Sequence, residues 1–210
     1  MKEFLYDWCG LNLWLFHAIN DLRGDLIDWI MQAGTFLGGH DLFAVYLSLL
    51  ACFILWQASR QSTQTGHALT IDVQRWLTAL TVFSLAYTAE GLLIPMLKHS
   101  LDFPRPPLAL PAELLHVIGK PELHHSLPSG HANFAMTIAA SLWPLLHRRG
   151  RLGLVIFVVW VGLSRVNLGA HFPADVIAGY LLGWVVVWLI HKLLHRLLRY
   201  KTPPADATRP

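Results

Sequence analysis

The sequence contains few charged residues: Lys, Arg, Asp and Glu together make up 14% of its 210 residues. Hydrophobic residues make up 54%, and the mean hydropathy is +0.45. This balance excludes an ordinary soluble globular domain. The net charge is only +3, and the basic residues lie in short connections rather than along one stripe, which argues against a nucleic-acid-binding protein.

Cysteine is scarce as well. Cys9 and Cys52 both lie in or beside apolar segments, so neither a disulfide framework nor a cysteine metal site is expected. We find no internal repeat. The N-terminus lacks a basic region followed by a clean apolar core and a small-residue cleavage site, so we expect no removable signal peptide.

Long apolar runs are what the sequence does contain. Several approach the roughly 20 residues that a membrane-spanning helix requires. We therefore predict an all-α, polytopic membrane bundle of about six transmembrane helices, preceded by an N-terminal interfacial helix over residues 4–20. Residues 1–200 would form a single integral membrane domain, and residues 201–210 a disordered tail. The expected spans are residues 26–38, 42–57, 76–97, 129–146, 152–168 and 173–194.

The basic residues predict the orientation of this bundle. With six spans they fall on one side, which the positive-inside rule makes cytoplasmic, together with the C-terminus. The loop 99–128, with a short amphipathic helix expected at 112–118, and the break 166–172 then face outward. We expect the inner membrane of a bacterium. The residues concerned are Arg60, Arg75, Arg148, Arg149, Arg151, Lys192, Arg196, Arg199 and Lys201, of which the middle three belong to an expected turn at 147–151.

One polar break between two apolar runs groups Arg165, His171 and Asp175. Pro173 suits the first turn of a helix, which would bring Asp175 about one turn from His171. An imidazole oriented by a carboxylate and flanked by a guanidinium is suited to act as a nucleophile beside an anion clamp. The alternative is a solvated turn that carries ordinary polar residues.

Two further segments carry similar side chains. Lys98 closes one expected span, and Arg105 follows between two prolines that restrict the backbone. The alternative is a snorkelling lysine and a solvated arginine. Ser129, Gly130 and His131 begin another span, where a helix start offers N–H groups to an anion. The alternative there is a capped helix with a histidine at the membrane interface.

Taken in order, the three segments resemble the three-part signature of the type-2 phosphatidic acid phosphatase family. Its superfamily also includes bacterial acid phosphatases and vanadium haloperoxidases. The resemblance covers roughly residues 75–195, without a departure at a signature position. The segments read Lys98-x6-Arg105-Pro106, Pro128-Ser129-Gly130-His131 and Ser164-Arg165-x5-His171-x3-Asp175.

This resemblance implies a phosphatase that works without a metal or another cofactor. His171 would be the nucleophile that forms a phosphohistidine, and Asp175 would hold its other ring nitrogen. His131 would protonate the leaving oxygen and then activate water. Such a set of cations and histidines suits phosphoryl transfer. The phosphate oxygens would be bound by Lys98, Arg105, Ser129, the backbone N–H of Gly130, and Arg165.

The apolar context predicts a lipid phosphate or diphosphate as substrate, with its tail in the bilayer and its headgroup in an outward-facing site. The family offers undecaprenyl pyrophosphate, phosphatidic acid, phosphatidylglycerol phosphate and lipid A phosphate. We expect membrane lipids as neighbours, but no nucleic acid and no obligatory protein partner. Only 21 residues separate Pro106 from Pro128, which favours an open site without a large lid.

Three alternatives to hydrolysis stay open. A phosphotransferase on the same scaffold would use an acceptor alcohol in place of water. A lipid or anion transporter is disfavoured, because its ionisable residues would lie near the midplane and its halves would repeat. A vanadate-dependent oxidation would use the same residues.

Other polar residues lie outside the signature. The outer loop contains His116, His124 and His125, but their spacing matches no standard metal site, which favours ordinary loop residues. Glu90 and Asp28 lie within expected spans, where a carboxylate is costly unless it is paired. Each could form a hydrogen bond inside the bundle or influence the entry of a lipid.

Overall fold

The computed structural model describes residues 6–61 and 68–200, and all regular structure within these ranges is helical. The predicted all-α class is therefore confirmed, while the tail 201–210 lies outside the described residues. The helices are α2 (Leu11–Asn20), α3 (Asp25–Leu37), α4 (Phe43–Gln61), α5 (Ala68–Leu101), α6 (Pro106–Ala109), α7 (Gly130–Leu142), α8 (Arg148–Asn167) and α9 (Pro173–Tyr200), with 3-10 turns η1 (His40–Leu42), η2 (Ala112–Leu114) and η3 (Trp143–Leu145).

Four of the described helices are long and apolar enough to cross a bilayer, which supports an integral membrane protein. They correspond to α4, α5, α8 and α9. The two other expected spans, α3 and α7, have 13 residues each. At about 1.5 Å per residue, such a helix extends only about 20 Å, so the count of six spans stays a prediction.

Several predicted boundaries are wrong. The polar connection at 58–74 is largely helical, since α4 continues to Gln61 and α5 begins at Ala68. Polar side chains do not by themselves end a helix, and no proline interrupts these ends. The expected turn at 147–151 is the first turn of α8. The amphipathic helix expected at 112–118 is only the 3-10 turn η2, because the chain is extended at Leu115 and the N–H of Ile118 then donates to the carbonyl of Leu168.

Close packing between α7 and α9 brings the second and third parts of the signature together. A Cβ added at Gly179 would lie 2.5 Å from the carbonyl oxygen of Ser129, and one at Gly183 would lie 2.7 Å from that of Asn133. Only glycine permits so close an approach of the two backbones. The first turns of α7 and α9 are thereby held side by side.

Aromatic rings fill the space between α4, α5 and α7. The rings of Phe43 and Tyr87 stack with their centroids 3.7 Å apart, and Phe83 and Phe134 complete the cluster. Large apolar side chains such as Leu92 and Leu181 point outward instead. An outer surface of this kind fits a bundle surrounded by lipid.

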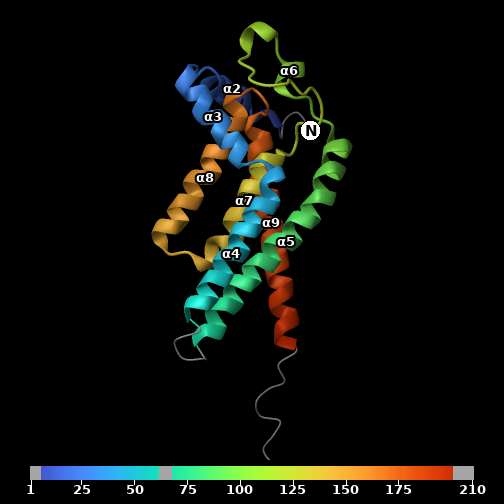
Figure 1. Ribbon diagram of the computed structural model, residues 1–210. Coiled ribbons are helices and arrows are strands. Elements are labelled where there is room, and N and C mark those ends of the chain that lie inside the picture. Colours follow the sequence, from blue (N-terminus) through green and yellow to red (C-terminus); the bar gives the residue numbers. More distant parts are fainter. Residues whose placement is uncertain (1–5, 62–67, 201–210) are drawn as a thin grey trace, which may run out of the picture.

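The loops that carry the signature meet at one end of the bundle. In Figure 1 this end, at the top, contains α2, α3 and α6, while the last turns of α4 and α9 and the first turns of α5 lie at the bottom. The predicted outward-facing segments and these basic helix ends thus lie at opposite ends of the molecule.

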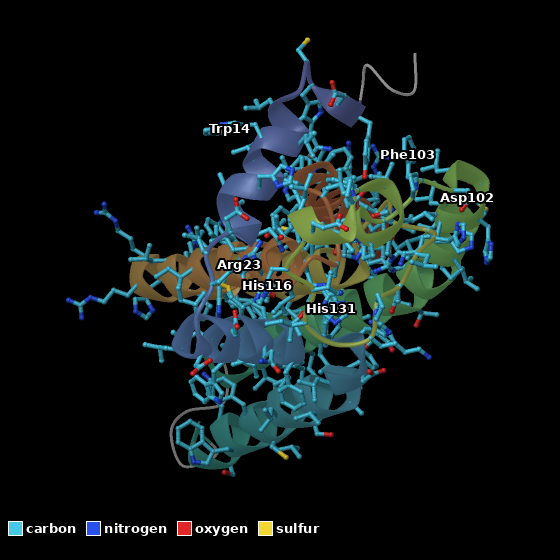
Figure 2. All side chains as sticks on the ribbon, turned by 90° about the horizontal axis from the view of Figure 1, so that it is seen from above. Trp14, Arg23, Asp102, Phe103, His116 and His131 are labelled. Atoms are coloured by element: carbon cyan, nitrogen blue, oxygen red, sulfur yellow. The ribbon has the colours of Figure 1, made fainter. Side chains whose placement is uncertain are left out.

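Helix α2 closes the signature end from one side. The Asn20 amide donates to the carbonyls of His116 (2.8 Å) and Asn167 (2.7 Å). The Oδ1 atom of Asn12 accepts the N–H of Ala174 at 2.9 Å, in the first turn of α9. On the outer face of α2, Trp14 is exposed and points away from the bundle, as Figure 2 shows. The predicted helix within 4–20 therefore exists from Leu11, and its interfacial position stays a prediction.

Candidate active site

Asp175 is the most thoroughly hydrogen-bonded carboxylate of the site, and it is fully buried. Its Oδ2 atom accepts the hydroxyl of Ser126 (2.5 Å) and the N–H of Phe172 (2.8 Å). Its Oδ1 atom accepts the hydroxyl of Tyr6 at 2.9 Å. A buried carboxylate is tolerated when donors of this kind surround it. Helix α9 begins at Pro173, as predicted, which places Asp175 in its first turn.

His171 lies between this carboxylate and the cations. Its Nδ1 atom is 3.4 Å from Oδ2 of Asp175, and its Nε2 atom is 3.4 Å from Nη1 of Arg105. Burial lowers the pKa of His171 well below its ordinary value, and the charges of Arg105, Arg165 and Lys98 lower it further. A neutral ring with its proton on Nδ1, facing the carboxylate, carries its lone pair on Nε2. That atom faces the cationic side of the site.

Two backbone carbonyls fix the guanidinium of Arg105. Its Nε donates to the carbonyl of His124 at 3.0 Å, and its Nη1 to that of Ala170 at 3.4 Å. Its Nη2 forms an ion pair of 2.5 Å with Glu122. The backbone N–H of Arg105 also donates to the carbonyl of Leu123. The predicted clamp residue is therefore held rigidly, with one edge bound to an acidic side chain.

Arg165 and Ser129 each present a buried polar atom without a protein partner. One amino group of Arg165 donates to the hydroxyl of Thr35, whereas its Nε has no acceptor in the described part of the chain. Ser129 stands at the N-cap of α7, but its hydroxyl makes no capping bond and is buried without a partner among residues 6–61 and 68–200. Its N–H donates to the carbonyl of Asp175 at 3.0 Å, which ties the starts of α7 and α9 together. Unpaired buried donors of this kind are expected where a ligand binds.

A pocket of about 510 Å³ is lined by Arg105, His131 and Arg165. His131 lies in the first turn of α7, near the centre of the molecule in the view of Figure 2. The loop residues from Val117 to Glu122 line this pocket as well. The short loop between Pro106 and Pro128 therefore forms one wall of the site.

Lys98 lines an adjoining pocket of about 380 Å³, together with Gly130, rather than the pocket of the two arginines. It still lies within electrostatic reach of Arg105, Arg165 and Asp175. The structure thus brings all eight predicted site residues to one end of the bundle. Lys98 approaches them from the side of α5.

Sequence reasoning missed three residues that contact this set. Ser126 lies two residues before Pro128, so a hydroxyl next to the signature was the available signal. Tyr6 is remote in sequence and carried no signal. It stacks on Phe103 with centroids 4.5 Å apart, and burial, followed by the charge of Asp175, raises its pKa. Glu122 also gave no hint of its contact with Arg105.

The other candidates of the sequence have partners of their own. The imidazole of His116 lies 3.2 Å from Oδ1 of Asp28, and Glu90 accepts the hydroxyl of Thr137 at 2.6 Å. His125 lies 3.1 Å from Asp102. Among residues 6–61 and 68–200, no group of three or more His, Cys, Asp or Glu side chains is arranged to hold a metal ion.

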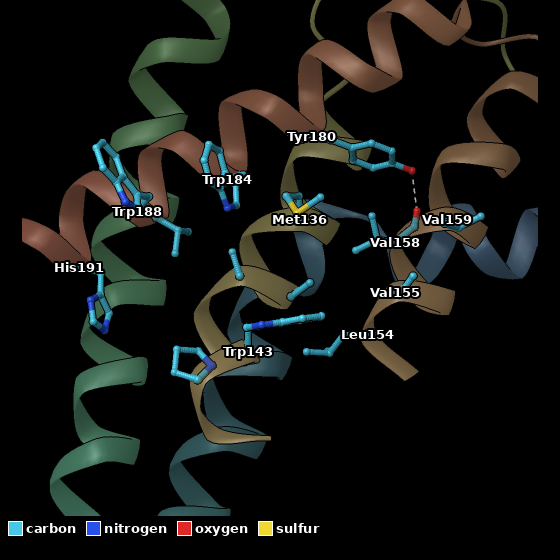
Figure 3. A pocket seen from close by; sticks show the side chains of 14 residues that line it. Met136, Trp143, Leu154, Val155, Val158, Val159, Tyr180, Trp184, Trp188 and His191 are labelled. Carbon is cyan, nitrogen blue, oxygen red and sulfur yellow. Dashed lines mark hydrogen bonds between the residues drawn. The ribbon is translucent and has the colours of Figure 1, made fainter. Parts of the chain in front are cut away.

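A separate pocket of about 640 Å³ lies between α7, α8 and α9 (Figure 3). Its walls are apolar apart from the rims, where His191 lies and where the Tyr180 hydroxyl donates to the carbonyl of Val158 at 2.6 Å. It contains none of the predicted site residues, so it is no candidate for binding a phosphate.

The signature and its surroundings match a known family. A family model described as the PAP2 superfamily matches residues 79–199, a range that contains every predicted site residue. The chain belongs to this superfamily.

Two curated relatives are phosphatases by name. Over 152 residues the chain is 30% identical to a lipid A 1-phosphatase of Rhizobium johnstonii. The aligned stretch covers 67% of this chain and 57% of that protein. It is 43% identical over 54 residues to a lipid A 1-phosphatase of Rhizobium etli, covering 26% of this chain and 23% of that protein. The chain thus spans little more than half the length of the first relative and about a quarter of the second.

Two solved PAP2 structures share the arrangement of helices. LpxE from Aquifex aeolicus superposes with a TM-score of 0.70 at 26% identity, over 87% of this chain and 95% of that one. A transmembrane PAP2-type phosphatidylglycerolphosphate phosphatase from Bacillus subtilis superposes with a TM-score of 0.65 at 21% identity, over 91% and 88%. At 21% identity, the similarity to the second structure supports the fold alone.

Proposed function

We propose that this PAP2 protein is a membrane lipid phosphatase that forms a phosphohistidine on His171. One observation carries the proposal. The Nδ1 side of His171 faces a buried carboxylate, while its Nε2 side faces the guanidinium of Arg105 in a pocket that also contains His131 and Arg165. A nucleophile with an orienting carboxylate, a cation clamp and a second histidine is what phosphoryl transfer without a metal requires.

The reaction would proceed in two displacements. In the first, Nε2 of His171 attacks the phosphorus, the bond from phosphorus to the lipid oxygen breaks, and His131 gives a proton to that oxygen. In the second, water attacks the phosphohistidine and gives a proton to His131, which releases inorganic phosphate and neutral His171. The negative charge of the bound phosphate favours the protonated state of His131 before the first step.

The anion would be bound by groups that lack protein partners in the described residues. These are the Nε of Arg165 and the hydroxyl of Ser129, both buried. The first N–H groups of α7, starting at Gly130, add a positive end to the site. Arg105 would hold the oxygens beside His171, and Lys98 would approach from the adjoining pocket.

The site would face the outer side of a bacterial inner membrane. Its residues lie at the end of the bundle opposite the last turns of α4 and α9 and the first turns of α5, which fits the positive-inside rule with a cytoplasmic C-terminus (Figure 1). We further propose that α3 and α7 complete six spans. Both are short, but α7 packs between α5, α8 and α9 and buries most of its residues. Helix α3 packs along α8 and leaves Leu26, Trp29 and Phe36 exposed, apolar side chains suited to contact lipid.

A lipid phosphate monoester is the substrate we favour, and a lipid A-type 1-phosphate is the first to test, because both curated relatives carry that activity in their names. Diphosphates such as undecaprenyl pyrophosphate, as well as phosphatidic acid and phosphatidylglycerol phosphate, belong in the same panel.

The test is release of inorganic phosphate from this panel by purified protein in detergent, with EDTA present. His171→Ala is the test variant. His147→Ala, an exposed histidine at the opposite end of α8, is the matched control. We expect release that survives EDTA, is lost in His171→Ala and is unchanged in His147→Ala. Release by His171→Ala at the wild-type rate, or no release from any lipid, would contradict the proposal.

A further inference from the structure

An acidic side chain occupies the edge of Arg105 that a phosphate would need. The Nη2 atom of Arg105 lies 2.5 Å from Oε2 of Glu122, and the arginine is almost wholly buried. The other edges of the guanidinium are bound to the carbonyls of His124 and Ala170, and to Nε2 of His171. The guanidinium would therefore keep its orientation if Glu122 left.

Glu122 is held far less firmly than Arg105. Its side chain is 65% exposed, compared with 6% for Arg105, and Arg105 is its one ion-pair partner among the described residues. A carboxylate that is mostly hydrated can move into water at small cost. An incoming anion can thus take its place without burying an unpaired charge.

The charges around the pocket make this exchange selective. Among the described side chains that line the pocket of Arg105, Arg165 and His131, Glu122 is the one carboxylate. Asp175 lies behind His171 and is fully buried. In the free protein Glu122 therefore supplies the counter-charge at the mouth of the clamp.

We propose that Glu122 competes with phosphate for Arg105 and thereby determines which anions the site retains. A phosphate monoester carries close to two negative charges at neutral pH and displaces a single carboxylate. A phosphodiester carries one negative charge, so its attraction to Arg105 is little stronger than that of the carboxylate it must displace. After hydrolysis, the return of Glu122 to Arg105 displaces inorganic phosphate. The effect of this exchange on turnover rests on the proposed function. The competition for Arg105 does not, because it applies to the binding of any phosphate dianion.

The experiment measures binding first and turnover second. The dissociation constant of inorganic phosphate is determined by isothermal titration calorimetry for the wild type, Glu122→Gln and Glu122→Asp in detergent. Glu113→Gln, an exposed glutamate in the same outer loop without a contact to the clamp, is the matched control. A short-chain phosphatidic acid and a short-chain phosphatidylglycerol, titrated in parallel, separate a lipid monoester from a lipid diester.

Glu122→Gln is expected to bind inorganic phosphate about five- to tenfold more tightly, since one exposed ion pair no longer competes. Its preference for the monoester over the diester should shrink by a similar factor. Glu122→Asp should lie between it and the wild type, and Glu113→Gln should match the wild type. In turnover, Glu122→Gln should show stronger inhibition by inorganic phosphate.

A role of Glu122 in merely holding Arg105 or the loop makes the opposite prediction. Phosphate affinity that falls or stays within twofold in Glu122→Gln would overturn the inference, as would phosphate binding by neither protein. Tighter binding without turnover of any lipid would leave the competition intact and would instead contradict the phosphatase. The two proposals can therefore fail separately.

Discussion

The Nδ1 atom of His171 lies 3.4 Å from Oδ2 of Asp175, four residues further along the chain. The two belong to different local structures. The N–H of His171 donates to the carbonyl of Arg165 at the end of α8, whereas Asp175 lies in the first turn of α9. Their relative placement thus depends on the turn between two helices, and the carboxylate is fixed further by Ser126 and Tyr6.

Replacing Asp175 by Asn should lower kcat by at least about 100-fold, because an amide can accept or donate and no longer favours the tautomer with a free Nε2. Asp21→Asn is the control, since this exposed aspartate pairs with Arg23 alone among the described residues. Kinetics of phosphate release from a lipid phosphate monoester test this. Unchanged kcat in Asp175→Asn would remove this residue from the catalytic set.

Tyr6→Phe should reduce kcat about tenfold and leave KM nearly unchanged. The variant removes one hydrogen bond to Asp175, worth on the order of 1 to 2 kcal/mol, but keeps the stacking on Phe103. Ser126→Ala should act on the same carboxylate, so the double variant should lose less than the product of the two single losses. Steady-state kinetics are measured for the wild type, the two single variants and the double variant. If the two losses in kcat multiplied, the hydroxyls would not act through the same carboxylate.

Thermal stability should decline as the pH is lowered below about 6.5, and part of that decline should disappear in His171→Gln. The pKa of His171 is lowered in the folded state, so near its ordinary value only the unfolded chain takes up the proton. As the pH falls below that value, protonation increasingly stabilises the unfolded state relative to the folded one. Above it, the contribution of His171 to stability is complete. Melting curves from pH 5 to 8, taken by tryptophan fluorescence, compare the slopes. Equal slopes for the two proteins would contradict a buried neutral His171.

Gly179→Ala should destabilise the bundle by about 1 to 3 kcal/mol, because the added methyl group would meet the carbonyl of Ser129. Gly153→Ala on α8, where a Cβ meets open space, is the control and should be neutral or slightly stabilising. Because Ser129 and His131 begin α7, Gly179→Ala should also lower activity. Melting temperatures and phosphate release measured together test both effects, and a Gly179→Ala protein as stable as Gly153→Ala would contradict the close packing.

The all-helical fold and the assembly of the signature could be predicted because both depend on local patterns. Apolar runs determine helices, and Pro173 marks the start of α9. The extent of α3 was predicted closely, 26–38 against Asp25–Leu37. Helix α7 ends at Leu142 rather than at 146, because Pro144 lies in the apolar run and the chain continues as the 3-10 turn η3. Composition does not reveal that polar residues near Gln61 and Ala68 continue the helices α4 and α5.

The support around the site could not be predicted because it comes from contacts distant in sequence. Tyr6 reaches Asp175 across 169 positions, and Asn20 reaches Asn167 across 147. The loop that provides Glu122 is positioned by the N–H of Ile118 on the carbonyl of Leu168. No periodicity or motif marks such residues, because their partners lie elsewhere in the fold.

The covalent intermediate is the most direct test of the proposed mechanism. Purified protein is mixed with a lipid monoester labelled in its phosphate, quenched in alkali, in which phosphohistidine is stable, and digested for mass spectrometry. In the wild type we expect the label on the peptide that contains His171, and in His171→Ala we expect none. In His131→Ala more label should accumulate if loss of the base slows hydrolysis of the intermediate more than it slows phosphoryl transfer. Label on another residue, or turnover without any labelled peptide in either active protein, would contradict a phosphohistidine at His171.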